Sequence, residues 1–216
     1  SMNNGSLTGS GANNNYYIVN GLTLSGNNTI TGGIDIRSVA AGTFNVTSGT
    51  TIVSGTIDNV HGSSNPLTKN GTGTLTLSGN NFMRGTTLNA GTLNINSATA
   101  LGNGTFAFTI NGGTIDNTSG SAKTLTNNNT QSWNGDFTFL GTNGSLNMGT
   151  GNVTMNASRT VTVNSGNFIV DGKISGAGFG LTKNGSGTLR INPSSTYSGA
   201  TTINGGKLQI HNTAGT

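Results

Sequence analysis

Several residue types are missing from the sequence, and each absence excludes a class of structure or site. The 216 residues contain no cysteine, which excludes disulfide frameworks and thiolate metal sites. They contain no glutamate, and other good helix formers are scarce, so a helix-rich fold is excluded. No apolar run approaches about 18 residues and no charged leader precedes one, so we expect neither a membrane-spanning helix nor a signal peptide.

Charged residues are also few. Nine basic residues and five aspartates give a net charge of +4, and the high pI follows from the lack of glutamate. Nucleic-acid binding requires clustered basic residues with interleaved aromatics. The basic residues are instead scattered singly, as Arg37, Lys69, Arg84, Lys123, Arg159, Lys173, Lys183, Arg190 and Lys207. We therefore expect no nucleic-acid partner.

The residues that are abundant are small, polar and regularly spaced. Glycine, threonine, asparagine and serine make up about three fifths of the chain, and hydrophobic residues make up 31%. Apolar and polar residues alternate in segments such as 73–77, 91–95 and 187–191, which predicts strands with one buried and one wet face. Asn-Gly pairs between such segments mark turns. An apolar content of this size suits the thin core of a repeating coil.

The chain repeats itself. Residues 67–95 read LTKNGTGTLTLSGNNFMRGTTLNAGTLNI, and residues 181–210 read LTKNGSGTLRINPSSTYSGATTINGGKLQI. A partial third copy covers residues 22–36. A strand of the same kind returns after 18 residues in the first full copy and after 19 in the second. Equivalent leucines and isoleucines would therefore stack into ladders from one coil to the next.

This constant spacing predicts a parallel β-helix, because a sandwich or barrel has no reason to repeat its sequence at one period. We expect an all-β, right-handed parallel β-helix of about ten coils, in which residues 1–216 form one continuous segment of a longer protein. Arg190 should lie on the outward face. The buried ladders should contain Leu75, Leu77, Leu93, Ile95, Leu189, Ile191, Leu208 and Ile210.

The repeat resembles a known family. The motif LTKxGxGTLTLSG, then an apolar residue, a glycine turn, TTL or TTI, and NAGTLNI, is similar to the autotransporter-associated β-strand repeat, also called the passenger-associated transport repeat. Residues 67–95 carry it almost completely, residues 181–210 carry it well, and residues 22–36 carry its middle. Pro193 and Ser194 depart from the pattern at one turn. The family is a structural unit and names no catalytic residues.

The resemblance implies a cellular setting. Autotransporter passengers are bacterial proteins that are secreted or displayed on the outer membrane. The resemblance therefore implies a translocator β-barrel of the same polypeptide, outside this sequence, as a partner. It also implies that the chain folds after it has left the cell.

The sequence contains no set of residues that predicts a catalytic, cofactor or metal site. β-Helix enzymes that act on polysaccharides need clustered carboxylates, and the five aspartates are spread out. We expect structural roles for all of them. Asp35 should face solvent, Asp58 and Asp116 should be equivalent turn residues in two copies of Gly-Thr-Ile-Asp-Asn, and Asp136 and Asp171 should lie in glycine turns.

Three other features suggest a function. His61 follows Asp58 by three residues but lacks a second base and a nucleophile, so a solvated loop histidine is the simpler interpretation. Outward threonine pairs such as Thr74 and Thr76 would suit ice binding, although β propensity also explains them. Trp133 is a candidate platform for sugar stacking. The acidic ladder of a calcium-binding loop is missing.

We therefore predict a non-enzymatic structural segment of an autotransporter passenger, without a cofactor. It would aid translocation across the outer membrane and folding, and would present adhesive or effector regions in virulence. One alternative is an adhesin that binds a host-cell surface protein or glycan through its lateral face. The other is a polysaccharide-active β-helix enzyme.

Overall fold

The chain folds entirely as short strands and turns. The structure is a computed structural model that describes residues 1–8, 15–18, 21–36, 42–58 and 65–210. Within these residues there is no helix, and hence none that could cross a membrane. All pairings between the described strands are parallel, as in β10 (Leu67–Asn70) with β12 (Thr86–Leu88). The all-β prediction is confirmed.

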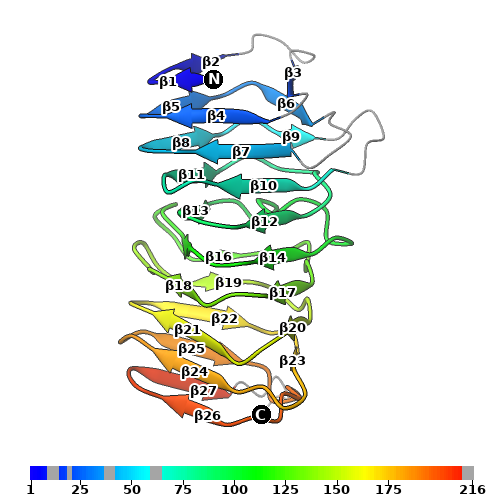
Figure 1. Ribbon diagram of the computed structural model, residues 1–216, viewed down its shortest axis with the longest axis vertical. Coiled ribbons are helices and arrows are strands. Elements are labelled where there is room, and N and C mark those ends of the chain that lie inside the picture. The colour runs from blue at the N-terminus through cyan, green and yellow to red at the C-terminus, as the bar shows by residue number, and fades with distance from the viewer. Residues whose placement is uncertain (9–14, 19–20, 37–41, 59–64, 211–216) are drawn as a thin grey trace.

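Two long sheets extend along the molecule (Figure 1). The nine strands of sheet A are, in spatial order, β1 (Met2–Asn3), β4 (Leu22–Ser25), β7 (Gly42–Val46), β10, β12, β14 (Phe108–Ile110), β17 (Gln131–Trp133), β20 (Val153–Met155) and β23 (Ile174–Ser175). The ten strands of sheet B are β2 (Ser6–Leu7), β5 (Asn28–Ile30), β8 (Thr50–Val53), β11 (Thr74–Leu77), β13 (Thr92–Ile95), β15 (Thr114–Asp116), β18 (Phe137–Phe139), β21 (Arg159–Val163), β24 (Leu181–Asn184) and β26 (Thr201–Ile203). In both sheets the spatial order follows the chain order.

Two shorter sheets form the third side. Sheet C contains β3 (Asn15–Ile18), β6 (Gly33–Ile36) and β9 (Ile57–Asp58). Sheet D contains β16 (Lys123–Thr124), β19 (Leu146–Asn147), β22 (Asn167–Val170), β25 (Thr188–Ile191) and β27 (Lys207–Ile210). Irregular segments connect them: the Phe82 N–H donates to the Ile57 carbonyl (2.8 Å), and the Thr126 N–H donates to the Ala98 carbonyl (3.0 Å). The third side is thus continuous, although it loses its strands in the middle.

The chain passes from sheet A to sheet B to the third side and then returns to sheet A one coil further on. Figure 1 shows the result as a stack of coils along one axis, with β1 near one end and β27 near the other. This is a parallel β-solenoid, as predicted. The ten strands of sheet B agree with the expectation of about ten coils.

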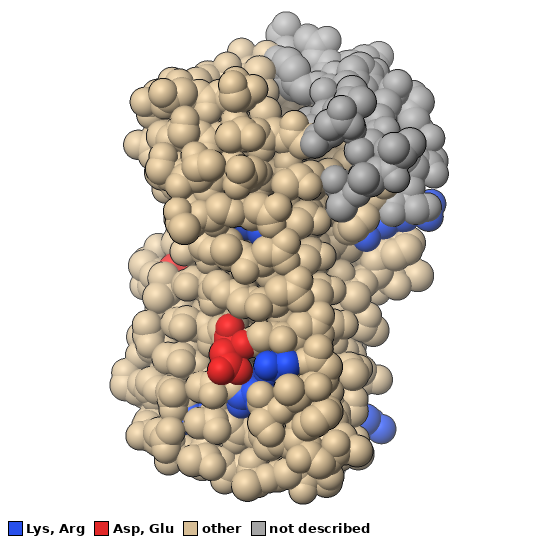
Figure 2. Space-filling view, viewed as in Figure 1, with Lys and Arg blue, Asp and Glu red and all other residues tan. Residues whose placement is uncertain are grey.

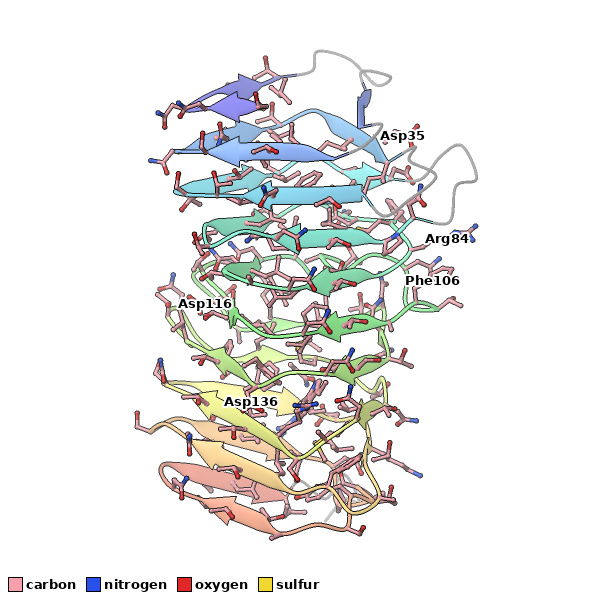
Figure 3. The ribbon with its side chains drawn as sticks, viewed as in Figure 1. Asp35, Arg84, Phe106, Asp116 and Asp136 are labelled. Atoms are coloured by element: carbon pink, nitrogen blue, oxygen red, sulfur yellow. The ribbon has the colours of Figure 1, made fainter. Side chains whose placement is uncertain are left out.

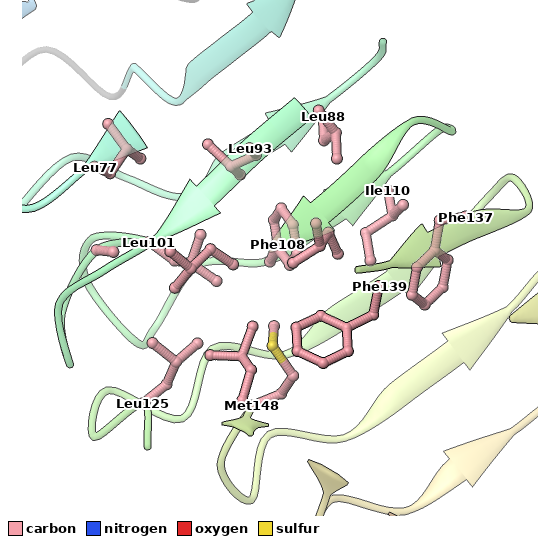
Figure 4. Packing of buried hydrophobic residues seen from close by; sticks show 14 of the residues in the cluster. Leu77, Leu88, Leu93, Leu101, Phe108, Ile110, Leu125, Phe137, Phe139 and Met148 are labelled. Carbon is pink, nitrogen blue, oxygen red and sulfur yellow. The ribbon is translucent and has the colours of Figure 1, made fainter. Parts of the chain in front are cut away.

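The core is a set of apolar ladders inside this stack (Figure 4). Leu75 pairs in register with Leu93, and Leu93 pairs with Ile115 on the next coil. All three are fully buried, and each contributes about 1.5–3 kcal/mol through the apolar area removed from water. Of the eight ladder residues predicted from the sequence, six are buried: Leu75, Leu77, Leu93, Ile95, Leu189 and Ile191.

The prediction was wrong for the other two residues, which lie on β27. Leu208 is only partly buried, and the side chain of Ile210 is 56% exposed. Both pair in register with buried partners, Leu189 and Ile191 on β25. β27 is the last strand of sheet D, so no described strand covers its other side. Burial in a solenoid needs a neighbouring coil on both sides.

Polar ladders explain the unusual composition. Six threonines of sheet B stack in register on its outward side: Thr50, Thr74, Thr92, Thr114, Thr138 and Thr162. Where sheet A turns toward sheet B, side-chain amides bond to one another along the stack. Asn89 donates to Asn70 (2.7 Å), Asn111 donates to Asn89 (2.7 Å), and Asn134 donates to Asn111 (3.1 Å). Threonine and asparagine are frequent because each coil repeats the same outward position.

The two full repeat copies occupy different sides of the solenoid. In residues 67–95 the four strands lie in sheets A, B, A and B, whereas their equivalents in residues 181–210 lie in sheets B, D, B and D. One copy is therefore displaced from the other by one side of the coil. The repeat sequence specifies a pair of strands and the corner between them, but it does not specify the side on which they lie.

Candidate functional site

The five aspartates do not converge on one site, although Asp35 and Asp58 occupy paired positions on neighbouring strands. Figure 3 places Asp35, Asp116 and Asp136 at different heights of the stack. Asp35, on β6, is fully buried, so the expectation that it faces solvent was wrong. Alternation along a strand predicts on which side a residue lies, whereas burial depends on what covers that side.

Asp58 and Asp116 are not equivalent positions, contrary to the prediction. Asp58 ends β9 in sheet C, beside Asp35 in register, whereas Asp116 ends β15 in sheet B. The buried Asp116 carboxylate accepts hydrogen bonds from the backbone N–H groups of Asn117 (2.8 Å) and Thr142 (3.0 Å) and from the Thr142 hydroxyl. Thr142 belongs to the next coil, so this carboxylate joins two coils. Such a role is structural, because the carboxylate links the backbone of its own turn to that of the next coil.

Asp136 and Asp171 lie in turns, as predicted. Asp136 accepts a hydrogen bond from the backbone N–H of Thr160 (2.8 Å), and the Arg159 guanidinium lies 4.0 Å from the same oxygen. Arg159 also donates to the Trp133 carbonyl (2.9 Å). Charged side chains are few on the described part of the face shown in Figure 2.

Asp171 lies in a cluster of several polar side chains. Its carboxylate receives hydrogen bonds from Arg190 (3.1 and 3.3 Å) and from the Asn147 amide (2.8 Å). A neighbouring open cavity of about 340 Å³ is lined by Thr150, Asn152, Asp171, Gly172, Lys173 and Asn192. The cluster offers hydroxyl, amide, carboxylate and ammonium groups of the kind that bind sugars. It contains one carboxylate, whereas glycoside hydrolysis by the usual route needs two.

Arg190 lies on the outward side of β25, as expected, but it is not free in solvent. Its side chain is 24% exposed and is paired with Asp171. An outward residue of a solenoid strand has neighbours one coil away, in this case Ile169 and Gln209. It is therefore half-buried rather than free in solvent.

The remaining candidates do not form a site. Trp133 is fully buried, donates its indole N–H to Gln131 (3.2 Å) and contacts the Phe137 ring edge-on at 5.1 Å, so it is not an exposed platform for sugars. His61 and its proposed pairing with Asp58 lie outside the described residues. Within the described part of the chain, no three acidic or histidine side chains come together in a way that could hold a metal ion.

One pair of side chains stands out from the side of the stack. The Arg84 guanidinium lies 5.3 Å from the centre of the Phe106 ring, a cation–π contact. Figure 3 shows both side chains projecting beyond the strands. Phe82, on the same strand-free part of the third side, is exposed. This is an exposed apolar feature on a surface that is otherwise mainly polar.

Two lysines have a position that the sequence analysis missed. Lys69 and Lys183 are fully buried, whereas the sequence analysis counted them only as singly scattered basic residues. Lys69 Nζ donates to the carbonyls of Asn70 (2.9 Å), Gly71 (2.8 Å) and Ala90 (3.1 Å). The signal was present in the alternation, because lysine in Leu-Thr-Lys-Asn occupies the same inward side as the leucine.

Burial changes the acidity of both lysines. Desolvation lowers the pKa of Lys69 from 10.5 to about 8 and also lowers the pKa of Lys183, because a buried ammonium loses its hydration. The carbonyl oxygens around each Nζ act in the opposite direction, since they accept hydrogen bonds from the charged form. Lys69 is thus mainly protonated at neutral pH.

Comparison with known proteins identifies the repeat. The family model of the passenger-associated-transport-repeat matches residues 67–95 and 181–210. No curated protein and no solved structure matches the chain. The matched ranges are the two full copies recognised from the sequence, and the partial copy at residues 22–36 stays a prediction. The chain therefore carries two passenger-associated transport repeats, each built as four strands of a parallel β-solenoid.

Proposed function

We propose that this chain is a structural segment of an autotransporter passenger, which aids the export and folding of the passenger and presents adhesive or effector regions outside the cell. The repeat family and the solenoid fold both fit such a segment. The family implies a protein that is secreted or displayed on the cell surface. Its partner in export would be a translocator β-barrel of the same polypeptide.

The observation that carries this proposal is the way the two repeats build coils. Each copy supplies two consecutive strands on each of two sides, so a repeat contains both a coil and the coil on which it stacks. A formed coil offers paired backbone groups and an apolar ladder to the next one. Coil-by-coil folding outside the membrane would oppose backward sliding of the chain. No catalytic step is needed for this role.

Deletion of a single coil in register tests the proposal. Thr74 pairs with Thr92, so removing residues 75–92 from the complete protein joins two equivalent points and removes one repeat coil. Thr114 pairs with Thr138 in the same sheet, so removing residues 115–138 is a matched deletion outside the repeats. We expect the first deletion to lower the amount of passenger on the cell surface more than the second, at equal synthesis. Equal display of the two variants would contradict a transport role for the repeat.

A second candidate function is binding of a host glycan or protein through the lateral face. The polar cavity beside Asp171 favours it, because several hydrogen-bonding groups converge there. The surface-display experiment, extended by an attachment assay on the same cells, distinguishes the two candidate functions. Display that stays normal in the Lys173→Ala variant, together with loss of attachment to host cells or to a glycan array, would favour the adhesin.

A further inference from the structure

The buried lysine occupies the same environment in both repeats, although the repeats lie on different sides of the solenoid. Lys69 lies on sheet A and Lys183 on sheet B. Lys183 Nζ donates to the carbonyls of Asn184 (2.7 Å), Gly185 (2.8 Å) and Gly205 (3.2 Å). These residues are the sequence equivalents of the three that bind Lys69. The arrangement has therefore formed twice, each time at the corner that follows the lysine strand.

Each lysine connects two coils. Two of its acceptors belong to the turn directly after its own strand, and the third, Ala90 or Gly205, belongs to the equivalent turn of the next coil. Among the described residues, no other donor reaches the carbonyls of Gly71 and Ala90, or those of Gly185 and Gly205. A fully buried carbonyl without a donor costs about 1–3 kcal/mol, and these carbonyls belong to residues that are partly buried. The ammonium supplies the missing donors of both turns.

A glycine in the second coil makes room for the ammonium. Gly91 has φ +70°, and a Cβ there would lie 2.8 Å from Lys69 Nζ and 2.4 Å from the Gly71 carbonyl oxygen. Its equivalent, Gly206, has φ +64° and would meet the Gly185 carbonyl oxygen at 2.6 Å. The lysine of Leu-Thr-Lys-Asn-Gly and the glycine about 22 residues later are thus parts of one corner. This relation explains why both recur in the repeat motif.

In the described strands that follow Lys69 at its register position, the inward residue carries no ammonium. Ile110 follows Leu88 at the register position of Lys69 on the next coils, and Trp133 follows Ile110. The immediate register neighbours of Lys69 are Phe44 and Leu88, both uncharged. The neighbours of Lys183, Val161 and Ile203, are also uncharged. The lysine is therefore a feature of the repeat corner rather than of the solenoid in general.

We propose that Lys69 and Lys183 are coil-joining residues: each positions the corners of two successive coils by donating from one ammonium to the carbonyls of both. The two coils within a repeat would then be joined more tightly to each other than the surrounding coils are to their neighbours. This inference concerns the folded chain itself and does not depend on the export proposal. Failure of either one leaves the other standing.

Substitution of the lysine by residues of similar length tests this role. Lys69→Met keeps most of the apolar stem and removes all donors, whereas Lys69→Gln keeps a neutral donor. Lys173→Met is the matched control, because Lys173 is exposed. In urea unfolding of the purified chain we expect Lys69→Met to lower the folding equilibrium constant by about tenfold or more, Lys69→Gln by less, and Lys173→Met hardly at all. A Lys69→Met variant as stable as the unmodified chain would overturn the proposal, since buried charges can cost more than their hydrogen bonds return.

Hydrogen exchange distinguishes a positioning role from a loss of packing. The Thr92 N–H closes the Lys69 corner by donating to the Gly73 carbonyl (3.2 Å), and the Thr138 N–H makes the same contact with Gly113 (3.1 Å) in a coil without lysine. We expect Lys69→Met to speed exchange at Thr92 much more than at Thr138. Equal acceleration of amide exchange at Thr92 and Thr138 would contradict a local positioning role for Lys69.

A third measurement needs no variant, and it holds even where Lys69→Met fails to fold. In the unmodified chain, the ammonium protons of two of the five lysines should exchange slowly enough to give nitrogen-bound proton signals at neutral pH. Rapid exchange at all five lysines would show that the ammoniums are not held by the carbonyls.

Discussion

The two full repeats have nearly the same sequence pattern but differ in position and depth. Residues 67–95 lie inside the stack, where Leu93 and Ile95 are fully buried. The equivalent residues of the second copy, Leu208 and Ile210, lie on β27, the last strand of sheet D, and are partly buried or exposed. The first copy also lies on sheets A and B, and the second on sheets B and D.

This difference distinguishes the features of the repeat that its own sequence forms from those that depend on the neighbouring coils. The strand pairs, the glycine corner and the buried lysine recur in both copies, so local sequence suffices to form them. Burial of the apolar ladder recurs only where a coil lies on both sides. Because stability in a solenoid is roughly a sum of unit and neighbour terms, the inner copy should tolerate core substitutions less well than the outer one.

The largest expected effect is on the apolar ladder. Leu93→Ala should lower the free energy of unfolding by about 2–5 kcal/mol, because it leaves a cavity between two covered coils. Leu208→Ala, at the equivalent place on the outer coil, should cost less than about 1.5 kcal/mol, since this leucine is already partly in solvent. Chemical denaturation of the two variants measures the difference. Equal losses would mean that β27 is covered in solution.

The next effect is a dependence of stability on pH. Lys69 has a folded pKa of about 8, below its ordinary 10.5, so the unfolded chain binds more protons between these values. The free energy of unfolding should therefore rise with pH from about 8 to 10.5, by up to about 3 kcal/mol. The burial penalty is fully present below pH 8 and is relieved above it. Lys183 should act in the same direction.

Unfolding curves measured at a series of pH values test this expectation. The rise should shrink in Lys69→Met and should persist in Lys207→Met, which removes the exposed lysine next to the corner glycine of the second copy. A profile that falls over the same interval would have the wrong sign for a buried ammonium.

A smaller effect is expected at the outward residues of β25. Replacement of an outward arginine that is free in solvent by alanine changes stability by no more than about 0.5 kcal/mol. The structure raises this to about 1 kcal/mol, because the half-buried guanidinium is paired with Asp171 at 3.1 Å. Gln209→Ala, at the next register position, is the control. If Arg190→Ala has no more effect than Gln209→Ala even in low salt, the ion pair contributes nothing measurable.

The smallest effect concerns the asparagine ladder. Asn89→Ala removes two side-chain hydrogen bonds in the middle of the ladder, to Asn70 and from Asn111. Asn204→Ala removes the one such bond to Asn184 in the second copy. These amides are exposed, so water replaces their lost hydrogen bonds. We therefore expect the free energy of unfolding to fall by about 0.5–1 kcal/mol in Asn89→Ala and by less than about 0.5 kcal/mol in Asn204→Ala. Thermal unfolding should rank the two variants in this order.

Much of the fold was predictable from the sequence because a repeat encodes the same local structure each time. Alternation identified the strands, the Asn-Gly pairs identified turns, and the return of a strand after 18 or 19 residues favoured stacked parallel coils over a sandwich. The boundaries of the two full repeats were also correct. These features depend on residues that are close together in the chain.

The prediction failed where a residue's surroundings come from other coils. Asp35 faces outward in the alternation of its strand but is buried, and Asp58 and Asp116 share a pentapeptide but end strands on different sheets. The alternation places Lys69 on the inward side of its strand, but nothing in its local sequence shows that carbonyls of two successive turns surround its ammonium. Sequence periodicity contains no information on which side of the coil a strand occupies.

The sequence by itself determined the strands, the turns, the apolar ladders and the repeat family, since each follows from residue types at short spacing. The tertiary structure alone decided which side each repeat occupies and which polar groups are enclosed. The physical reason is that burial and hydrogen bonding in a solenoid depend on the coil above and the coil below. Those coils are one full circuit away in the chain, and their alignment is set by the summed lengths of the turns between them.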